Sequence, residues 1–487
     1  MAYLVVIIFF ISVLFIFLFS IGQLHLTWYY LKSSKHLIME TPKPGELPIV
    51  TIQLPVYNEV YVVERLLENI SRLSYPKEKF EIQVLDDSTD DTVNLVADKV
   101  NQLKKEGLEV HHIHRTHRTG FKAGALQNGL QYAKGDLIAI FDSDFLPESD
   151  FLLKTIIYFQ DPEIGVVQTR WGHINKEYSL LTRLQAFALD AHFFVEQSGR
   201  SYAKSFINFN GTGGIWRKEA ILDAGGWSAD TLTEDLDLSY RAQMRGWKFK
   251  YLEDVVAPAE LPIFMPAIKS QQFRWNKGAA ETAKKNLDKV LRSGYPISTK
   301  IHAFFHLLNS SVFLCLLISG IVSIPILFIK EYNPLFEILS RLGSFFLLGF
   351  FSITFFYWIA TKKSYPENSF LYFIKLFPLF LILSMGLSFH NAYAVIEGLF
   401  GYKSPFIRTP KFNISRNNGN LKGNLYSKSE FSYITLAEGI LFLYFAFGVA
   451  SGIILQDHGF LIFHLMFSIG FAAVFFYSII PVVNDRK

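Results

Sequence analysis

The sequence predicts a membrane protein in which an α/β domain with a mainly parallel sheet is joined to an α-helical transmembrane bundle. Two observations support this prediction. Hydrophobic residues make up 50% and charged residues only 18% of the 487 residues, a balance that excludes a disordered or wholly soluble chain. The apolar residues also gather in long runs near both ends, whereas residues 47–300 alternate short β-rich runs with helical ones.

Charge and cysteine content exclude further classes. The formal net charge is only +4 and no long basic run occurs, so nucleic acid is a poor candidate partner. Cys315 is the single cysteine, which excludes an intrachain disulfide and a Cys-rich zinc module.

The N-terminal element, residues 1–30, is predicted to be a transmembrane anchor. The run 3–21 has no charged side chain and is long enough to cross a bilayer. No positive segment precedes it, and Lys32 and Lys35 follow it. We therefore expect an uncleaved anchor with the next domain in the cytoplasm.

The next element, residues 47–300, is predicted to be the α/β domain. Helical runs over 60–73, 91–105 and 122–133 separate its β-rich runs, which are 49–54, 82–85, 110–113, 137–141 and 166–168. In such sheets ligands bind beyond the carboxyl ends of the strands. No G-x-G-x-x-G turn follows the strands that end in acids, and no Walker A loop is present, which argues against dinucleotide chemistry and ATP-driven transport.

Acidic residues follow two of these strands. Asp86 and Asp87 end the second run, and Asp142 and Asp144 end the fourth. Two carboxylates past a sheet edge can hold Mg²⁺ or Mn²⁺, which in turn can bind a diphosphate. An isolated D-x-D is also typical of a solvated turn or a helix cap.

The C-terminal part is predicted to contain four spans. Two lie within residues 301–362, over 303–329 and 342–361, and two lie within 432–487, over 433–455 and 459–483. Lys375 and Pro378 interrupt the run 370–400, so we expect an interfacial or re-entrant helix there. The loop 401–431 carries six Lys or Arg residues against one acid, which places it in the cytoplasm.

A series of motifs carries a family resemblance. In chain order they are PVYNE at 55–59, DDS at 86–88, GFKAGAL at 120–126, DSD at 142–144, TED at 233–235 and QQFRW at 271–275. The series resembles the processive, membrane-integrated glycosyltransferases of family 2, which include cellulose, hyaluronan and mannan synthases. The stretches 209–217, 224–227 and 246–249 most resemble the plant cellulose-synthase-like A and C subgroups, which make β-1,4-mannan and β-1,4-glucan backbones.

The resemblance implies a GT-A-like domain and a role for each motif. Asp235 would be the general base of an inverting transfer, with Thr233 and Glu234 beside it; one base suffices for inversion. Asp142 and Asp144 would hold Mg²⁺ or Mn²⁺. The residues implied in donor binding are Tyr57, Asn58, Glu59, Asp86, Asp87, Lys122, Gly211 and Gly213. Thr-Glu-Asp is also typical of an N-cap followed by acids in a first helical turn.

Gln271, Arg274 and Trp275 would form the acceptor site on a short helix next to the membrane. Trp275 can stack on a sugar ring and Arg274 can pair with diphosphate oxygens. The alternative for Trp275 is an aromatic anchor at the bilayer surface. The stretch 406–411 resembles the family's gating loop, although Arg408 and Pro410 depart from its pattern; the alternative is a loop that touches anionic lipid headgroups.

Four histidines, His111, His112, His114 and His117, are not predicted to bind metal. His111 and His112 face opposite sides of a strand, no acids are expected nearby, and the arginines that follow would repel a cation.

The resulting prediction is a synthase that polymerises a β-linked, β-1,4 polysaccharide from UDP-glucose or GDP-mannose and threads it through its own helices. Its partners would be the nucleotide sugar, the growing polysaccharide and the bilayer, without nucleic acid. It would be a multi-pass protein of a bacterial inner or plasma membrane with a cytoplasmic catalytic domain. The alternative is transfer of one sugar to a membrane lipid; a non-enzymatic transporter is a distant third, because intramembrane ionisable residues are few.

Overall fold

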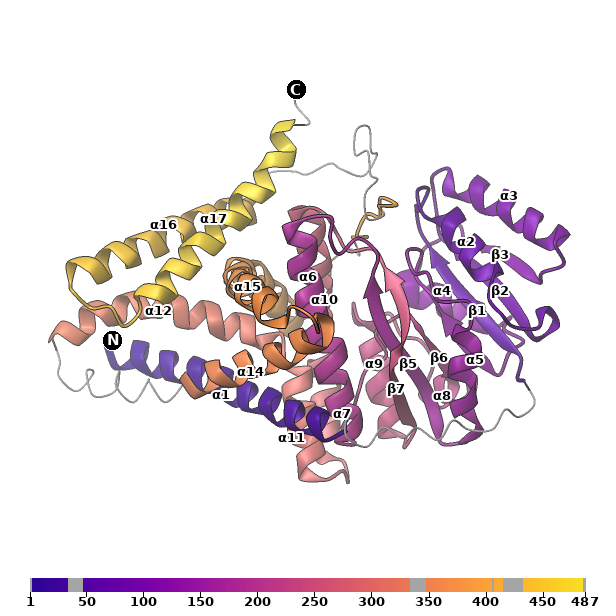
Figure 1. Ribbon diagram of the computed structural model, residues 1–487, viewed down its shortest axis with the longest axis horizontal. Helices are drawn as coiled ribbons and strands as arrows, with labels where there is room; N and C mark the ends of the chain where they lie inside the picture. Colours follow the sequence, from indigo (N-terminus) through magenta and orange to yellow (C-terminus); the bar gives the residue numbers. More distant parts are fainter. Residues whose placement is uncertain (1, 34–46, 333–346, 405–406, 415–431, 485–487) are drawn as a thin grey trace.

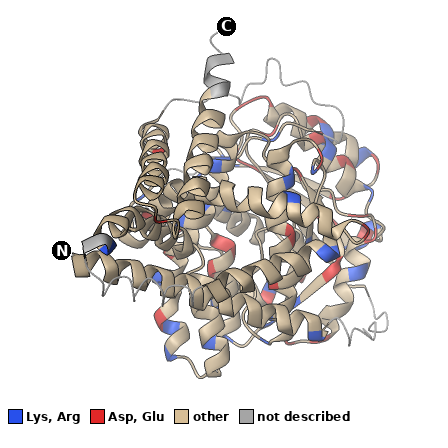
Figure 2. Cartoon of the chain, turned by 60° about the vertical axis from the view of Figure 1, so that its left-hand side comes forward, with Lys and Arg blue, Asp and Glu red and all other residues tan. Residues whose placement is uncertain are grey.

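The computed structural model describes the chain except for residues 1, 34–46, 333–346, 405–406, 415–431 and 485–487. An α/β domain lies at one side and long helices lie at the other (Figure 1). Figure 2 shows that charged residues are frequent over the α/β domain and sparse along the long helices of the bundle. The α/β domain joined to apolar helices that the composition predicted is therefore confirmed.

The sheet of the α/β domain has seven strands in the order β3-β2-β1-β4-β6-β5-β7. Strands β1 to β4 are parallel, β6 is antiparallel to β4 and β5, and β5 is parallel to β7. The strands are β1 Val50–Val56, β2 Phe80–Asp86, β3 Val110–His114, β4 Leu137–Ile140, β5 Ile164–His173, β6 Gly214–Arg217 and β7 Lys248–Ala259. The first five match the predicted β-rich runs, whereas β6 and β7 were not predicted.

Helices cover both faces of this sheet. Apolar side chains of α2, α3 and α5 pack on one face, and those of α4, α8 and α9 pack on the other. Strand β4 is apolar throughout, whereas β1 and β2 alternate apolar side chains with buried polar ones that bond between the strands, as Thr51 Oγ1 does to Glu81 at 2.6 Å. The helices are α2 Val63–Ser71, α3 Thr92–Lys105, α4 Phe121–Leu130, α5 Phe151–Ile156, α8 Lys218–Asp223 and α9 Glu234–Met244.

Between β5 and β6 the chain forms a helical excursion that packs on the membrane-side helices. It comprises α6 Leu180–Asp190, the π-helix η3 Ala191–Gln197 and α7 Ser198–Tyr202. Ala191, Phe194 and Val195 of η3 share an apolar cluster with Tyr30 and Phe356 of the bundle. This cluster joins the α/β domain to the bundle.

The remaining elements form the helical side of the molecule. They are α1 Ala2–Ser33, α10 Met265–Arg292, α11 Ile297–Leu307, α12 Ser311–Tyr332, α14 Leu347–Ser364, α15 Ser369–Phe400, α16 Tyr433–Ile454 and α17 Leu461–Asn484. Five described helices, α1, α12, α15, α16 and α17, are long and apolar enough to cross a membrane. The expected span 303–329 is divided into α11 and α12, and α14, which ends in Lys362, Lys363 and Ser364, is not among the five.

Helix α15 covers the run for which we expected an interfacial or re-entrant segment. It is one continuous helix of 32 residues that includes Pro378. Near its start Tyr372 stacks on Tyr365, with ring centroids 4.1 Å apart, and near its end Glu397 pairs with Lys277 of α10 at 2.8 Å. In between, Gly386 lies against the Gly470 backbone of α17. Its placement at the membrane interface stays a prediction.

Candidate active site

A cavity lies beyond the carboxyl ends of β1, β2 and β4, where helices α9 and α10 and the segment after α15 meet the sheet. This is the edge at which a parallel sheet presents a ligand site. Of the residues predicted for the site, those that line the cavity are Tyr57, Glu59, Asp87, Lys122, Asp142, Asp144, Gly211, Thr233, Glu234, Asp235, Gln271, Arg274 and Trp275.

Three predicted site residues are not among the residues that line this cavity: Asn58, Asp86 and Gly213. Asn58 joins the ends of β1 and β2, since its backbone N–H donates to Ser88 Oγ at 2.8 Å and its side-chain oxygen accepts from Thr89 N at 2.8 Å. Gly213 has a φ of +65°, and its carbonyl accepts hydrogen bonds from Thr169. These two residues shape the backbone around the cavity.

Asp86 is fully buried and accepts a hydrogen bond from His112 Nε2 at 2.8 Å, with His114 Nδ1 at 3.5 Å. The ligand atoms of these three side chains lie close enough together to hold a metal ion. The premise that no acids lie near the histidines was therefore wrong, because β2 pairs with β3 and brings Asp86 beside them. Sequence proximity does not reveal neighbours across parallel strands.

The two acids predicted to bind metal each face a lysine. Lys122 Nζ donates to Asp142 Oδ1 at 2.6 Å, and Lys411 Nζ donates to Asp144 Oδ2 at 2.7 Å. Lys122 also donates to the carbonyl of Gly211 at 3.0 Å. Both carboxylates follow β4 and line the cavity, so their donor set and position fit a hard divalent cation.

Asp235 lies in the first turn of α9 and faces Gly211. A Cβ at Gly211, which has a φ of +80°, would lie 3.0 Å from Asp235 Oδ2, so glycine gives the carboxylate room. Burial disfavours the charged carboxylate and the adjacent Glu234 adds negative charge; together they raise the pKa of Asp235 to about 7. A carboxyl group with this pKa can take up and release a proton near neutral pH.

Two arginines hold the part of the cavity at the ends of β1 and β2. Arg115 binds Asp87 through two hydrogen bonds, from Nε at 2.7 Å and from Nη2 at 2.6 Å. The guanidinium of Arg118 lies over the ring of Tyr57, 3.4 Å from its centroid. Tyr57 and Asp87 are thereby fixed at the ends of neighbouring strands.

Helix α10 carries Gln271, Arg274 and Trp275 into the cavity. It is a helix of 28 residues rather than the short helix we expected. Arg274 Nη2 donates to Thr409 Oγ1 at 2.6 Å, and burial lowers the pKa of Arg274 to about 10. The ring centroid of Trp275 lies 6.5 Å from that of Trp171 on β5, so two indoles flank the same part of the cavity.

The segment after α15 enters the cavity from the membrane side. Arg408 pairs with Glu59 at 2.6 Å, and the backbone N–H groups of Phe412 and Ile414 donate to the buried Glu260 carboxylate at 2.8 and 3.3 Å. Burial raises the pKa of Glu59 to about 7 despite Arg408. Phe406, the first residue of the proposed gating motif, lies outside the described residues.

Lys277 of α10 fixes the start of this segment. It is fully buried and donates to Glu397 at 2.8 Å, to the carbonyl of Tyr402 at 2.6 Å and to the hydroxyl of Ser404. The start of the segment is thus bound to α10, the helix that carries Trp275.

Sequence reasoning missed several residues that line the cavity, namely Arg118, Trp171, His173, Asn210 and Glu260. Asn210 could have been found because it adjoins Gly211 in a motif that was recognised. Glu260 could have been found only if strand β7, which it follows, had been predicted. His173 lies 3.2 Å from Asp190, a contact between β5 and α6 that local sequence does not indicate.

Comparison with known proteins agrees with this architecture. Residues 48–278 match the family model described as "Glycosyltransferase like family 2". The chain is 42% identical over 264 residues to a probable glucomannan 4-beta-mannosyltransferase 4 of Oryza sativa subsp. japonica, an alignment of 53% of this chain and 48% of that protein. It is 39% identical over 320 residues to glucomannan 4-beta-mannosyltransferase 1 of Cyamopsis tetragonoloba, covering 63% and 60%.

Among solved structures, the mannosyltransferase PcManGT from Pyrobaculum calidifontis, in complex with GDP-Man and Mn²⁺, aligns with a TM-score of 0.53 and 20% identity, covering 80% of this chain and 100% of that one. This likeness shows the GT-A-like fold. Residues 48–278 therefore form a family 2 glycosyltransferase domain, as the motifs predicted. The chain spans about half to two thirds of the length of the curated relatives it matches.

Proposed function

We propose that this protein is an inverting hexosyltransferase that elongates a β-1,4-linked polysaccharide from a nucleotide sugar. The observation that carries the proposal is the convergence, in one cavity, of a carboxylate with a pKa of about 7, two strand-end acids and a tryptophan on α10. The relatives named glucomannan 4-beta-mannosyltransferases support this class of product, and we propose GDP-mannose as the donor, with UDP-glucose as the alternative.

The donor would lie along the strand ends. Tyr57 and Asp87 would contact the nucleoside, and Lys122 would face the phosphates together with Arg274. A divalent cation held by Asp142 and Asp144 would neutralise charge on the diphosphate leaving group. For the cation to bind, Lys122 and Lys411 must release these two acids.

Asp235 would act as the base. It would remove the proton from the acceptor hydroxyl while that oxygen attacks the anomeric carbon opposite the diphosphate, which inverts the configuration. Trp275 would stack on the terminal acceptor sugar, and Trp171 lies beside it. Water is limited because the segment 407–414 and α10 cover the cavity.

The product would leave through the helical bundle. In this proposal the α/β domain lies on the cytoplasmic face of the membrane, and the apolar helices enclose a path for the polymer. The domain division also stays a proposal: residues 1–30 as anchor, 47–300 as catalytic domain, 301–362 and 432–487 as spans, 370–400 as interfacial and 401–431 as gating-like loop. The alternative acceptor is a membrane lipid that takes one sugar.

One experiment tests donor and product together. Purified protein in lipid nanodiscs is given GDP-mannose, GDP-glucose, UDP-glucose or UDP-N-acetylglucosamine, and nucleoside diphosphate release and product length are measured. We expect GDP release and a product that a β-1,4-mannanase digests. A product with a single sugar on lipid would overturn polymerisation, and no release from any donor would overturn the transferase.

A further inference from the structure

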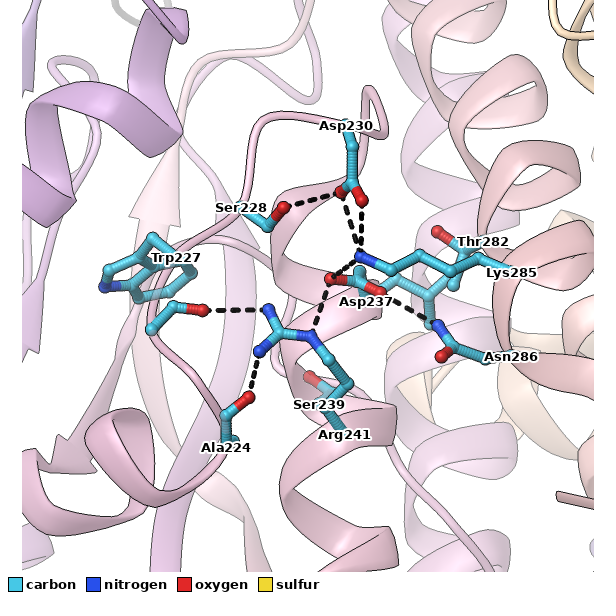
Figure 3. Close-up of polar contacts among 12 residues, drawn as sticks. Ala224, Trp227, Ser228, Asp230, Asp237, Ser239, Arg241, Thr282, Lys285 and Asn286 are labelled. Carbon is cyan, nitrogen blue, oxygen red and sulfur yellow. Dashed lines mark hydrogen bonds and ion pairs between the residues drawn. The ribbon is translucent and has the colours of Figure 1, made fainter. Parts of the chain in front are cut away.

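A network of charged and polar side chains around one buried carboxylate joins α9, the helix that carries Asp235, to α10, the helix that carries Trp275 (Figure 3). Its centre is Asp237, which is fully buried and lies two residues after Asp235. None of the side chains in this network lines the cavity, apart from the neighbouring Thr233. The transfer chemistry proposed above makes no use of Asp237.

Both oxygens of Asp237 are engaged. Oδ1 accepts from Asn286 Nδ2 at 2.8 Å, and Oδ2 accepts from Lys285 Nζ at 3.0 Å and from Arg241 Nε at 2.8 Å. Lys285 also binds Asp230 at 2.8 Å. A buried carboxylate held by two cations and an amide is a fixed point, because loss of a partner weakens the compensation of a charge that water cannot reach.

The same network fixes the loop that leads to the base. Arg241 donates to the carbonyls of Ala224 and Gly226, the latter at 2.8 Å, and Ser228 Oγ donates to Asp230 at 2.7 Å (Figure 3). Residues 224–233 are therefore tied to α9 at one end and to α10 at the other.

The contacts on α10 follow a helical period. Gly278 allows Thr233 to approach, since a Cβ there would lie 2.5 Å from Thr233 Cγ2. Further along the helix, Glu281 accepts from Leu232 N at 2.7 Å and Thr282 lies 3.2 Å from Thr233 Oγ1. The complete set is Gly278, Glu281, Thr282, Lys285 and Asn286, which are spaced i, i+3, i+4, i+7 and i+8 and so share one face.

This face continues toward the cavity. Trp275 and Arg274 precede Gly278 by three and four residues, and Gln271 precedes it by seven, so they lie on the same stripe of α10. One helix face thus presents the acceptor residues at its N-terminal end and holds the base-bearing segment at its centre.

We propose that Asp237 is a positioning residue, which holds the Asp235 carboxylate in reach of an acceptor bound at Trp275 by locking α9 onto α10 through Lys285 and Asn286. The proposal rests on the proposed function. A displacement of a reacting group by about 1 Å can lower the rate about 100-fold. The contacts of Asp237 with Lys285 and Asn286 therefore affect the rate although none of these side chains touches the substrate.

The test compares Asp237→Asn with Asp288→Asn. Asp288 pairs with Arg292 on the same helix but both side chains are exposed, at 68% and 80%, which makes it a matched control. We expect Asp237→Asn to lower kcat by about tenfold or more with an unchanged donor KM. Hydrogen exchange should become faster in residues 231–244, while Asp288→Asn changes neither quantity.

A second pair covers the case in which Asp237→Asn fails to fold. Lys285→Met leaves Asp237 paired with Arg241 and should lower kcat with unchanged donor KM, whereas Lys285→Arg keeps the cation and should restore the rate. The proposal is overturned if kcat is unchanged in both Asp237→Asn and Lys285→Met. It is also overturned if these variants lose donor binding and kcat to the same extent. If Asp235→Asn is fully active, Asp235 is not the base. Hydrogen exchange in residues 231–244 of the Asp237→Asn variant still reports whether Asp237 holds α9 on α10.

Discussion

Lys411 Nζ lies 2.7 Å from Asp144 Oδ2, so a side chain from the segment after α15 holds one of the two acids expected to bind metal. A divalent cation on Asp144 would repel the Lys411 ammonium group, because both are positive and share one carboxylate. We therefore expect donor binding with its metal to weaken the Lys411 contact, which frees this lysine to pair with the diphosphate.

Lys411→Met should strengthen metal binding. A hydrogen bond to a charged group contributes roughly 1.5–3 kcal/mol, so loss of this competitor should improve Mn²⁺ affinity about tenfold in calorimetric titration without donor. Lys403→Met, on an exposed residue of the same segment, is the control and should not change the affinity. An unchanged affinity in Lys411→Met would show that Lys411 and the metal do not compete.

Chelation should abolish transfer, and added Mg²⁺ or Mn²⁺ should restore it, because Asp142 and Asp144 are expected to hold the cation that stabilises the leaving diphosphate. The measurement is nucleoside diphosphate release before and after exhaustive EDTA treatment. Ca²⁺ serves as a comparison ion of different size. Activity that persists through chelation would remove the metal from the mechanism.

Asp235→Asn should retain donor binding and lose about 100-fold or more of the transfer rate, because the amide cannot accept the acceptor's proton. Donor affinity is measured by titration with the nucleoside diphosphate, and the rate by product formation. Near-normal turnover would exclude Asp235 as the base.

Transfer should fall with decreasing pH around neutrality. The base works only when deprotonated, and burial together with Glu234 raises the pKa of Asp235 to about 7. The pH profile of kcat/KM should therefore rise through about pH 7 rather than about pH 4. Glu234→Gln removes the neighbouring charge and should shift this rising limb to lower pH; a profile with no limb near neutrality would contradict the assignment.

Trp275→Ala should lose chain elongation while donor binding survives, because the stacking surface is removed and the acids are untouched. Product length by gel filtration and donor affinity by titration separate the two effects. Polymer of ordinary length at an ordinary rate would make Trp275 an interfacial anchor.

Much of the fold could be predicted because its signals are local. Strands β1 and β2 carry apolar side chains at alternate positions, β4 is apolar throughout, and all three are followed by polar motifs, which indicates both the strands and the edge at which Asp87, Asp142 and Asp144 lie. Strand β7 was missed because Lys248, Glu253 and Asp254 interrupt its apolar residues at an edge of the sheet.

The contacts between distant segments could not be predicted. Asp86 on β2 accepts a hydrogen bond from His112 on the neighbouring strand β3. Glu260 binds the backbone of residues 412–414. Helix α10 was expected to be short because its polar residues obscure the apolar period; its polar face is explained only by α9, which packs against it.

The anchoring of Tyr402 and Ser404 by Lys277 limits how far the following segment can travel. Lys411 follows Ser404 by seven residues, and a fully extended chain advances about 3.5 Å per residue, so chain length alone keeps Lys411 within about 25 Å of Ser404. Any displacement of Lys411 from Asp144 is therefore bounded by its short connection to α10.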